Sequence, residues 1–379
     1  MHILIAVLHR PDKPAGVCRH AANLARCLAE IDEVTQITLV TGVWQQHYFK
    51  TVFLLDSPKI NILGVDIKNT AISRNFWFLF GLPRLVKEIQ PDLVHLSFPF
   101  PFIRSLFACP VVATIHDLYP CQLPEQFGRI PAFFNRLFLQ QCIHSSDALT
   151  CVSQTTLHDL EYYFPEVISE QKKTTVIYNF VDFDRVEPKI PKILEEIADC
   201  PFILCVGQHR KNKNLDLLIQ AYAVLKQEHR FAEGTKSILV GSLGPETANL
   251  VESIRELDLE DSILMLSEID DNQLCWLYQN CQLVVIPSAV EGFCIPLVEA
   301  LYFSAQVVCS DIPILREIGS SNCTYFELAG DPIGNMARSI VSVAAPRENR
   351  SQQADTDSCL RFTKATIAAQ FLKLYAALI

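Results

Sequence analysis

Short apolar strands alternate with amphipathic helices along this whole sequence of 379 residues. The first strand, residues 2–7 (HILIAV), is apolar on both faces, which is typical of a parallel sheet covered on both sides. Alternation of this kind predicts doubly wound parallel sheets, whose ligands bind where the strands end. Further strands are expected at 36–41, 60–65, 92–98, 111–115, 148–152 and 174–178, and then at 202–206, 237–240, 262–266, 283–286, 307–309 and 324–326.

The length of the chain predicts two domains, each with its own core, because half of the residues are apolar. We expect a first Rossmann-like domain over residues 1–186 and a second over residues 187–350. Helices of the second domain are expected at 247–257, 271–280, 296–304 and 331–344. Residues 345–358 are polar without a period and are expected to be loop, and a last helix is expected within residues 359–379.

Composition excludes several classes of protein. The net charge of −10 divides into −1 over residues 1–190 and −9 over the rest, and so acidic a second half argues against nucleic acid as a partner. The near-neutral first half leaves an anionic acceptor or a lipid surface open. No apolar run is long enough to predict a membrane-spanning helix, and no basic region precedes residues 3–7 to suggest a signal peptide.

The cysteines point to a reducing compartment. There are 14 of them, they are scattered, and no C-x-x-C pair is present, which argues against zinc ribbons and redox motifs. We therefore expect buried free thiols and a cytoplasmic protein, either free or peripheral to the inner face of the membrane.

The stretch 283–304 (LVVIPSAVEGFCIPLVEALYFS) carries the clearest functional signal. It is predicted to be a strand, a tight turn containing Glu291 and Gly292, and a helix with Pro296 in its first turn. A helix start offers free N–H groups to phosphate, whereas Glu291 and Glu299 can accept hydrogen bonds from hydroxyls. A diphosphate flanked by sugars fits this combination.

The pattern E-G-F-x-x-P-x-x-E resembles the signature of retaining glycosyltransferase family 4, which has the GT-B fold of two Rossmann-like domains facing across a cleft. An E-x7-E spacing alone is common by chance, but here a strand precedes it and a helix follows. The resemblance implies that Glu291 holds the transferred sugar and Glu299 the ribose. The backbone from Gly292 through Phe293 and Cys294 to Ile295 would meet the donor diphosphate. It also implies that no metal is required and that the last helix returns to the first domain.

A basic loop follows the expected strand 202–206. Gly207 is followed by QHRKNKN, and cations after a strand form a phosphate-type loop. The segment resembles the family's V-G-x-x-x-x-x-K-N, in which Lys213 matches the lysine that neutralises the donor phosphates. Gln208 stands where the family often has arginine, and Arg210 is the candidate substitute.

Two positions of the first half also resemble the family. Gly16 matches the glycine loop that meets the donor diphosphate, although Ala15 replaces a preceding glycine. This loop contains no G-x-G-x-x-G motif, so it lacks the fingerprint of NAD-binding proteins. His116, which follows the strand 111–115, begins an H-D-L-x-P-x-x-x-P-E segment similar to that of bacterial mannosyltransferase-like members. Its position implies a contact with the donor sugar and favours GDP-mannose, whereas a lone histidine in apolar surroundings is more often structural.

The segment 182–184 is formally a D-x-D, the metal-binding pair of another glycosyltransferase fold. Because it lies in the expected linker ahead of Pro188 and Pro191, we interpret it as structural and expect no metal. The run Asn179-Phe180-Val181-Asp182 resembles the family's N-G-V-D, with Phe180 in place of the glycine, and is interpreted as the end of the first domain.

Three aromatic stretches, 75–80, 98–102 and 130–138, have two interpretations. They are flanked by arginines at 74, 84, 104, 129 and 136. An amphipathic face of this composition can lie in a bilayer interface. Core helices with snorkelling arginines would look the same, and we favour that interpretation, with peripheral membrane contact as the alternative.

The sequence as a whole predicts a retaining glycosyltransferase that moves a hexose from a nucleotide diphosphate sugar to a glycan or lipid-linked acceptor, in polysaccharide biosynthesis. A nucleotide-sugar epimerase of the same architecture would instead form product without an acceptor. A non-catalytic sugar-binding or scaffold member would bind no nucleotide sugar.

Overall fold

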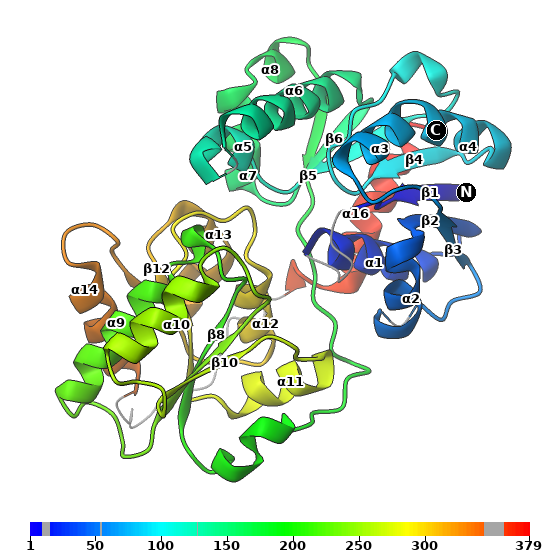
Figure 1. Cartoon of the computed structure of the whole chain (residues 1–379). Helices are drawn as coiled ribbons and strands as arrows, with labels where there is room; N and C mark the ends of the chain where they lie inside the picture. The colour runs from blue at the N-terminus through cyan, green and yellow to red at the C-terminus, as the bar shows by residue number, and fades with distance from the viewer. Residues whose placement is uncertain (10–15, 54, 127, 345–359) are drawn as a thin grey trace. The chain divides into compact units, whose positions relative to one another are not determined.

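The computed structural model describes residues 1–9, 16–53, 55–126, 128–344 and 360–379. The chain forms two compact units, unit 1 comprising Met1–Phe180 with Arg361–Ile379 and unit 2 comprising Val181–Leu360 (Figure 1). The division falls at Phe180, slightly before the residue 186 expected from the sequence. The expected loop 345–358 and most of the glycine loop before Gly16 lie outside the described residues.

Unit 1 is built on a seven-stranded parallel sheet, which confirms the doubly wound sheet predicted for the first half of the chain. The strand order is β3-β2-β1-β4-β5-β6-β7. The predictions for 60–65 and 111–115 match the observed bounds, and the others differ by one or two residues at one or both ends. The strands are β1 His2–Ala6, β2 Gln36–Gly42, β3 Ile60–Val65, β4 Leu93–Leu96, β5 Val111–Ile115, β6 Ala148–Cys151 and β7 Lys173–Val176.

Two layers of helices cover this sheet. The chain moves outward from β1 to β3 and then returns through β4 to β7, so right-handed crossovers place the two sets of helices on opposite faces. One face carries α1 Gly16–Ala29, α2 Val43–Val52 and the C-terminal α16 Lys364–Ala376, which share one apolar core. The other face carries α3 Ala71–Phe76, the π-helical η1 Trp77–Gly81, α4 Leu82–Ile89, α6 Arg129–Ser145, α7 Gln154–Tyr163 and α8 Glu166–Ser169; the short α5 Tyr119–Gln122 precedes α6.

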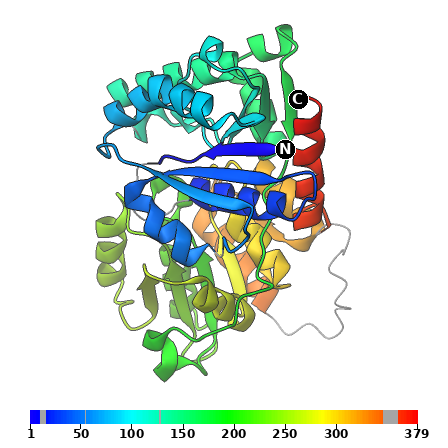
Figure 2. The same ribbon diagram turned by 90° about the vertical axis from the view of Figure 1, so that its right-hand side faces the viewer.

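The C-terminal helix belongs to unit 1, where it packs against α1 (Figure 2). Phe371 and Tyr375 are buried in that core. The hydroxyl of Tyr375 lies 2.7 Å from Nδ1 of His95 on β4, and the other ring nitrogen of His95 lies 2.8 Å from the hydroxyl of Thr114 on β5. Since unpaired polar groups are costly inside a core, this chain of hydrogen bonds fixes the position of α16 on the sheet.

The aromatic stretches are only partly buried, so the favoured core interpretation is wrong for two of the three. Phe100 and Phe102 are buried, and Phe100 stacks on Phe78 with ring centres 3.8 Å apart. Phe76 on α3 and Phe133 on α6, however, are each 64% exposed. These helices are apolar on both faces, and a helix in an outer layer can bury only one of them.

Unit 2 is built on a six-stranded parallel sheet with the order β10-β9-β8-β11-β12-β13. The second predicted sheet is thereby confirmed. Its strands are β8 Phe202–Val206, β9 Lys236–Val240, β10 Ile263–Leu266, β11 Leu283–Ile286, β12 Val307–Ser310 and β13 Thr324–Phe326. Its helices are α9 Leu215–Gln227, α10 Thr247–Glu256, α11 Asp271–Asn280, α12 Ile295–Tyr302, α13 Pro313–Gly319 and α14 Pro332–Ala344.

The strand order of unit 2 reverses between β8 and β11. These strands are hydrogen-bonded neighbours, with Leu283 opposite Ile203 and Val284 opposite Leu204. After β8 the chain turns towards β9, whereas after β11 it turns the other way, towards β12. Such a switch point leaves the loops after the two strands side by side at the carboxyl edge of the sheet, which is where ligands of open α/β sheets bind.

Candidate active site

The loops after β8 and β11 are joined by hydrogen bonds from two asparagine side chains. Asn212 Nδ2 donates to the carbonyl of Val290 at 3.1 Å, and Asn214 Nδ2 donates to that of Pro287 at 2.9 Å. The backbone N–H of Ala289 returns a bond of 2.8 Å to the Asn212 carbonyl. Asn214 has φ of 48°, a left-handed conformation that asparagine tolerates, and it ends the basic loop directly before α9. The two loops therefore form one joined platform.

This platform pairs Lys213 with Glu291. The Lys213 Nζ lies 2.5 Å from Glu291 Oε1, and the same oxygen accepts a hydrogen bond of 2.7 Å from Ser288 Oγ. Glu291 is only 8% exposed. Ser310, at the end of β12, donates from its hydroxyl to the Ser288 carbonyl and so holds the turn that carries Glu291 against β12. The two residues that the sequence predicted for phosphate and sugar thus contact each other.

Electrostatics keep this lysine charged. Burial lowers the pKa of Lys213, but the charge of Glu291 and the hydrogen bond to it outweigh burial, so the pKa is raised above its ordinary value. Burial raises the pKa of the neighbouring Cys205 to about 12 and that of Cys294 well above its usual range. Both thiols are therefore protonated and neutral, so the charge at this place comes from the Lys213–Glu291 pair.

Helix α12 begins close after Glu291. Cys294 precedes it with φ of 69°, and Pro296 lies in its first turn. Glu299 is buried within the helix and accepts a hydrogen bond of 2.8 Å from the hydroxyl of Tyr278 on α11. Tyr278 was not predicted from the sequence, because a buried tyrosine in a helix carries no signal of the acid it will meet. Phe293 is also buried, while Gly292 and Ile295 are half-buried.

Two glycines, Gly241 and Gly244, allow the loops of β8 and β9 to approach closely. A side-chain carbon at Gly241 would lie 1.9 Å from the Gly207 carbonyl oxygen, and one at Gly244 would lie 2.3 Å from that of His209. A carbon at Gly207 would lie 3.6 Å from the Lys213 side chain, an ordinary contact. The sequence indicated Gly207 but not Gly241 or Gly244, whose need arises only from the pairing of β8 with β9.

His209 adds a polar group that the sequence argument passed over. It is 1% exposed, and its Nδ1 lies 2.9 Å from the hydroxyl of Thr247, which itself accepts the N–H of Gly244 at 2.9 Å. A hydroxyl donates one hydrogen bond and accepts two, so the tautomer of the His209 ring sets which of Nδ1 and Thr247 is the donor. Within the described residues the Nε2 of His209 has no hydrogen-bond partner. Arg210, beside it, is exposed.

His116 lies at the carboxyl edge of the sheet of unit 1. Its Nε2 donates to the carbonyl of Ser97 at 2.8 Å, and its ring meets the edge of the His20 ring at 4.8 Å between centres. His20 in turn donates from Nδ1 to Asn179 Oδ1 at 2.6 Å. Burial lowers the pKa of His116 to about 3 and that of His20 to about 4, so both rings are neutral at pH 7.

The remaining predicted positions are less closely organised. Gly16 is the exposed first residue of α1, and no atom lies within 4 Å of where its side chain would start. Asp182 and Asp184 are tied within unit 2, since Asp182 Oδ1 accepts the N–H of Asp184 and the hydroxyl of Tyr302 donates to Asp184. Among the described residues, no group of three or more His, Cys, Asp or Glu side chains is placed to hold a metal ion.

Two family models match the chain consecutively. The model described as Glycosyltransferase Family 4 matches residues 14–185, and the model described as Glycosyl transferases group 1 matches residues 186–344. They meet close to the division between the two units, and the second covers the whole Lys213–Glu291 platform.

Several known proteins are similar to this chain. The O-antigen chain mannosyltransferase RfbU of Salmonella typhimurium is 24% identical over 316 residues, which is 82% of each chain. The N-acetylgalactosamine-N,N'-diacetylbacillosaminyl-diphospho-undecaprenol 4-alpha-N-acetylgalactosaminyltransferase of Campylobacter jejuni is 33% identical over 226 residues, 59% of this chain and 58% of that protein. The structure of sucrose-phosphate synthase from Thermosynechococcus elongatus matches with a TM-score of 0.71 at 17% identity, over 100% of this chain and 98% of that one. This likeness agrees with the GT-B fold class.

Proposed function

Because the chain belongs to the glycosyltransferases described by the group 1 and family 4 models, we propose that it transfers a hexose with retention from a nucleotide diphosphate sugar. Mannose from GDP-mannose is the proposed substrate, and the acceptor is a glycan or lipid-linked glycan of a growing surface polysaccharide. The name of the RfbU relative supports mannose, and the undecaprenol in the name of the Campylobacter relative supports a lipid-linked acceptor.

The Lys213–Glu291 pair carries this proposal. A lysine ammonium has three N–H donors, and one of them meets Glu291, so the others are available for phosphate oxygens. Both contacts of Glu291 use Oε1, which leaves Oε2 as an acceptor for sugar hydroxyls. One buried pair can therefore hold both sides of the bond between sugar and diphosphate.

The surrounding groups fit the rest of the donor. The backbone from Gly292 to Ile295, which leads into α12, and the cation of Arg210 would stabilise charge that develops on the leaving diphosphate. Gly207 would keep the adjacent backbone accessible. Glu299 is proposed to accept the ribose hydroxyls, held in position by Tyr278. These fixed positive groups take the place of a metal ion, so the proposal includes no metal and no further cofactor.

His116 is proposed to contact the transferred sugar as a hydrogen-bond acceptor. Its Nε2 proton is engaged by the Ser97 carbonyl, and the low pKa keeps Nδ1 unprotonated. A neutral ring held in this way accepts a hydroxyl proton but cannot serve as a general acid at pH 7. Gly16 is retained as a donor contact on the basis of the family resemblance.

We place this reaction in the cytoplasm, peripheral to the inner face of the membrane. The cysteines within the described residues are all free thiols, which fits a reducing compartment. No helix within the described residues is long and apolar enough to cross a membrane.

The test is a thermal-shift panel of nucleotides and nucleotide sugars. A ligand at about 100 times its Kd should stabilise the protein by about 2.7 kcal/mol, and we expect GDP and GDP-mannose to do so more than UDP sugars. Lys213→Ala should remove this stabilisation, whereas Lys236→Met, at the amino end of β9 on the opposite edge of the sheet, should not. Equal shifts with Lys213→Ala and wild type would remove Lys213 from the donor site.

Catalysis is tested with the ligand that the panel selects. Glu291→Ala should abolish transfer to the acceptor while the variant remains folded, and the anomeric configuration of the wild-type product should match that of the donor. Inverted configuration would contradict retention, and product from the nucleotide sugar without acceptor would favour the epimerase.

A further inference from the structure

One outer surface of unit 1 exposes many large apolar side chains. Helices η1 (which continues α3), α4 and α6 send their inner residues Phe78, Leu82 and Leu139 into one core on the same face of the sheet. They therefore form one layer (Figure 1), and their outward side chains lie on the outer side of that layer. We call these outward residues the outer apolar surface; its members are Ile72, Phe76, Phe80, Ile130, Phe133, Phe134 and Leu137.

On α6 the exposed residues form a regular stripe. Ile130, Phe133, Phe134 and Leu137 have the spacing i, i+3, i+4 and i+7, which places them along one side of a helix. Ile130 is 73% exposed and Phe133 64%. A second stripe, with Leu139 and others, fills the core. In a water-soluble helix the outer side would be polar, so this helix has two apolar sides and protein covers only one.

On α3 and η1 the exposed residues border a groove. The groove has a volume of about 470 Å³ and is lined by Ile72, Phe76, Trp77 and Phe80 together with the cations Lys68 and Arg84. The groove thus offers an apolar floor with positive charge beside it. Aromatic rings next to cations are the composition that settles at the boundary between lipid headgroups and chains.

The charge of this layer contrasts with that of the chain. The net charge of the protein is −10, yet the 17 residues of α6 include no aspartate or glutamate and do include the exposed Arg136. The segment from α3 to α4 carries Arg74, Arg84 and Lys87 against a single acid, Glu88. The layer is therefore complementary to an anionic surface, which the acidic second half of the chain would repel.

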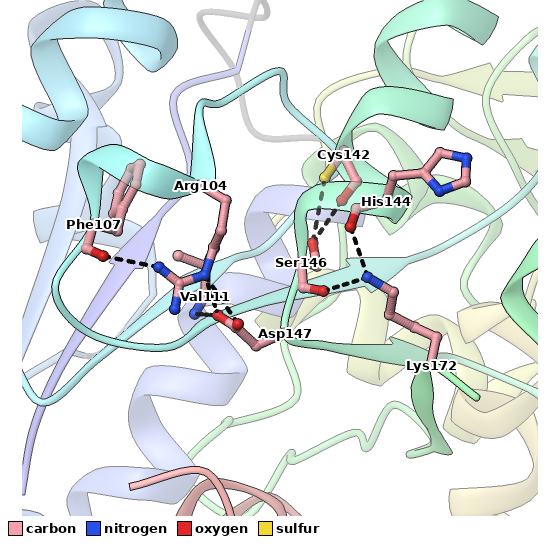
Figure 3. A network of polar contacts seen from close by, with 8 residues as sticks. All are labelled: Arg104, Phe107, Val111, Cys142, His144, Ser146, Asp147 and Lys172. Atoms are coloured by element: carbon pink, nitrogen blue, oxygen red, sulfur yellow. Dashed lines mark hydrogen bonds and ion pairs between the residues drawn. The ribbon is translucent and has the colours of Figure 1, made fainter. Parts of the chain in front are cut away.

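The C-terminal end of α6 is firmly attached, so its exposed half is held in a fixed orientation. Lys172 Nζ donates at 2.7 Å to the carbonyls of both His144 and Ser146 (Figure 3). The next residue, Asp147, accepts from Arg104 at 2.9 Å and from the N–H of Val111 at 2.7 Å. The exposed stripe belongs to the other, amino-terminal half of the helix.

From these observations we infer that the outer apolar surface docks onto an anionic phospholipid bilayer. Phe133, Phe134 and Phe76 would insert among the headgroups, while Arg136, Arg84 and Lys68 meet lipid phosphates. This inference names the surface for the membrane contact included in the proposed function, and it does not depend on which sugar is transferred. A bilayer explains this surface better than a protein partner does, since the exposed rings are spread over α3, η1 and α6 and lie among cations.

Vesicle flotation of the full chain tests this. We expect the wild-type protein to float with vesicles of about 30% phosphatidylglycerol in phosphatidylcholine. It should float less with vesicles of phosphatidylcholine alone. F133S/F134S should lower the partition coefficient about tenfold or more, because binding scales with the apolar area inserted. R136Q should lower it about fivefold on anionic vesicles only. The matched control is I193S/V251S, which replaces two exposed aliphatic residues of unit 2 and should float like wild type.

A second readout excludes a trivial loss through unfolding. Brominated phosphatidylcholine in the same vesicles should quench part of the tryptophan emission of wild type but not of W77F, because Trp77 lines the groove. All variants should unfold at the wild-type temperature in the absence of lipid. Failure of wild type to float, an equal loss in I193S/V251S, or a wild-type dimer that F133S/F134S converts to a monomer would each overturn the inference, the last in favour of a protein partner.

Discussion

Removing the lysine of the Lys213–Glu291 pair should destabilise unit 2 strongly. In Lys213→Met the carboxylate of Glu291 stays 8% exposed with a hydrogen bond from Ser288 alone. Breaking a buried ion pair from one side costs about 3–5 kcal/mol. We expect about 3 kcal/mol here, because the Ser288 bond remains and the lysine side chain is 19% exposed.

Neutralising the carboxylate as well should recover part of this loss. Lys213→Met/Glu291→Gln buries no charge, so a double-mutant cycle should give a coupling energy of about 2 kcal/mol. Because the pKa of Lys213 is raised in the folded protein, its contribution is fully present below the unfolded pKa of about 10.4 and is lost as the pH rises through the folded pKa. Measurements at pH 7 therefore report the whole pair.

The assay is urea unfolding followed through Trp276, which stacks on Phe202 within unit 2. Trp44 and Trp77 belong to unit 1 and are replaced by phenylalanine, because two units need not unfold together. Lys211→Met is the control, since this exposed lysine lies in the same loop and its loss should change the free energy of unfolding by less than about 0.5 kcal/mol. A loss below about 1 kcal/mol in Lys213→Met, or a double variant less stable than the single one, would refute a buried, coupled pair.

Three further predictions concern stability and positioning. His20 has a pKa of about 4 when folded and about 6.5 when unfolded, so unit 1 should lose about 3 kcal/mol between pH 6.5 and 4; acid unfolding of His20→Gln should show a shallower slope. Tyr278→Phe removes the hydroxyl that donates to Glu299, so it should lower the free energy of unfolding by about 1.5–3 kcal/mol and weaken nucleotide binding. Calorimetry that gave the wild-type affinity would contradict the role of Glu299. Gly241→Ala would place a carbon 1.9 Å from the Gly207 carbonyl oxygen and should cost about 1–3 kcal/mol or more in urea unfolding.

The sheets were predictable because their signal is local. Five or six consecutive apolar, β-branched residues, as in Val111–Ile115 and Phe202–Val206, form strands whatever lies elsewhere. The order of the strands then follows from right-handed connections and from the switch point. That rule is also why Lys213 and Glu291, which are distant in sequence, could both be assigned to one edge of one sheet.

The contacts among the site residues were not predictable, because they depend on side chains that meet only after folding. His20 and Asn179 are separated by most of unit 1, and Tyr278 lies on a different helix from Glu299. No period in the sequence shows which polar groups will share a bond. The burial predicted for the stretch 130–138 of α6 was wrong for another reason. Apolar residues such as Phe133 and Leu139 lie on both sides of this helix, so the sequence cannot indicate which side is buried.

The pairing of Lys213 with Glu291 changes what substitution at each position should do to donor binding. A diphosphate that approached Glu291 without the lysine would face an unscreened carboxylate in a buried site, where repulsion between like charges is strong. Lys213→Met thus removes an attraction and exposes a repulsion, whereas Glu291→Gln removes only an acceptor of sugar hydroxyls. We therefore expect Lys213→Met to raise the Kd for the nucleoside diphosphate more than Glu291→Gln does, and the double variant to bind it better than Lys213→Met alone. Titration calorimetry with the diphosphate, which has no sugar, isolates this effect. If the double variant bound no better than Lys213→Met, the two residues would act on the donor independently, and the shared role proposed for the pair would be wrong.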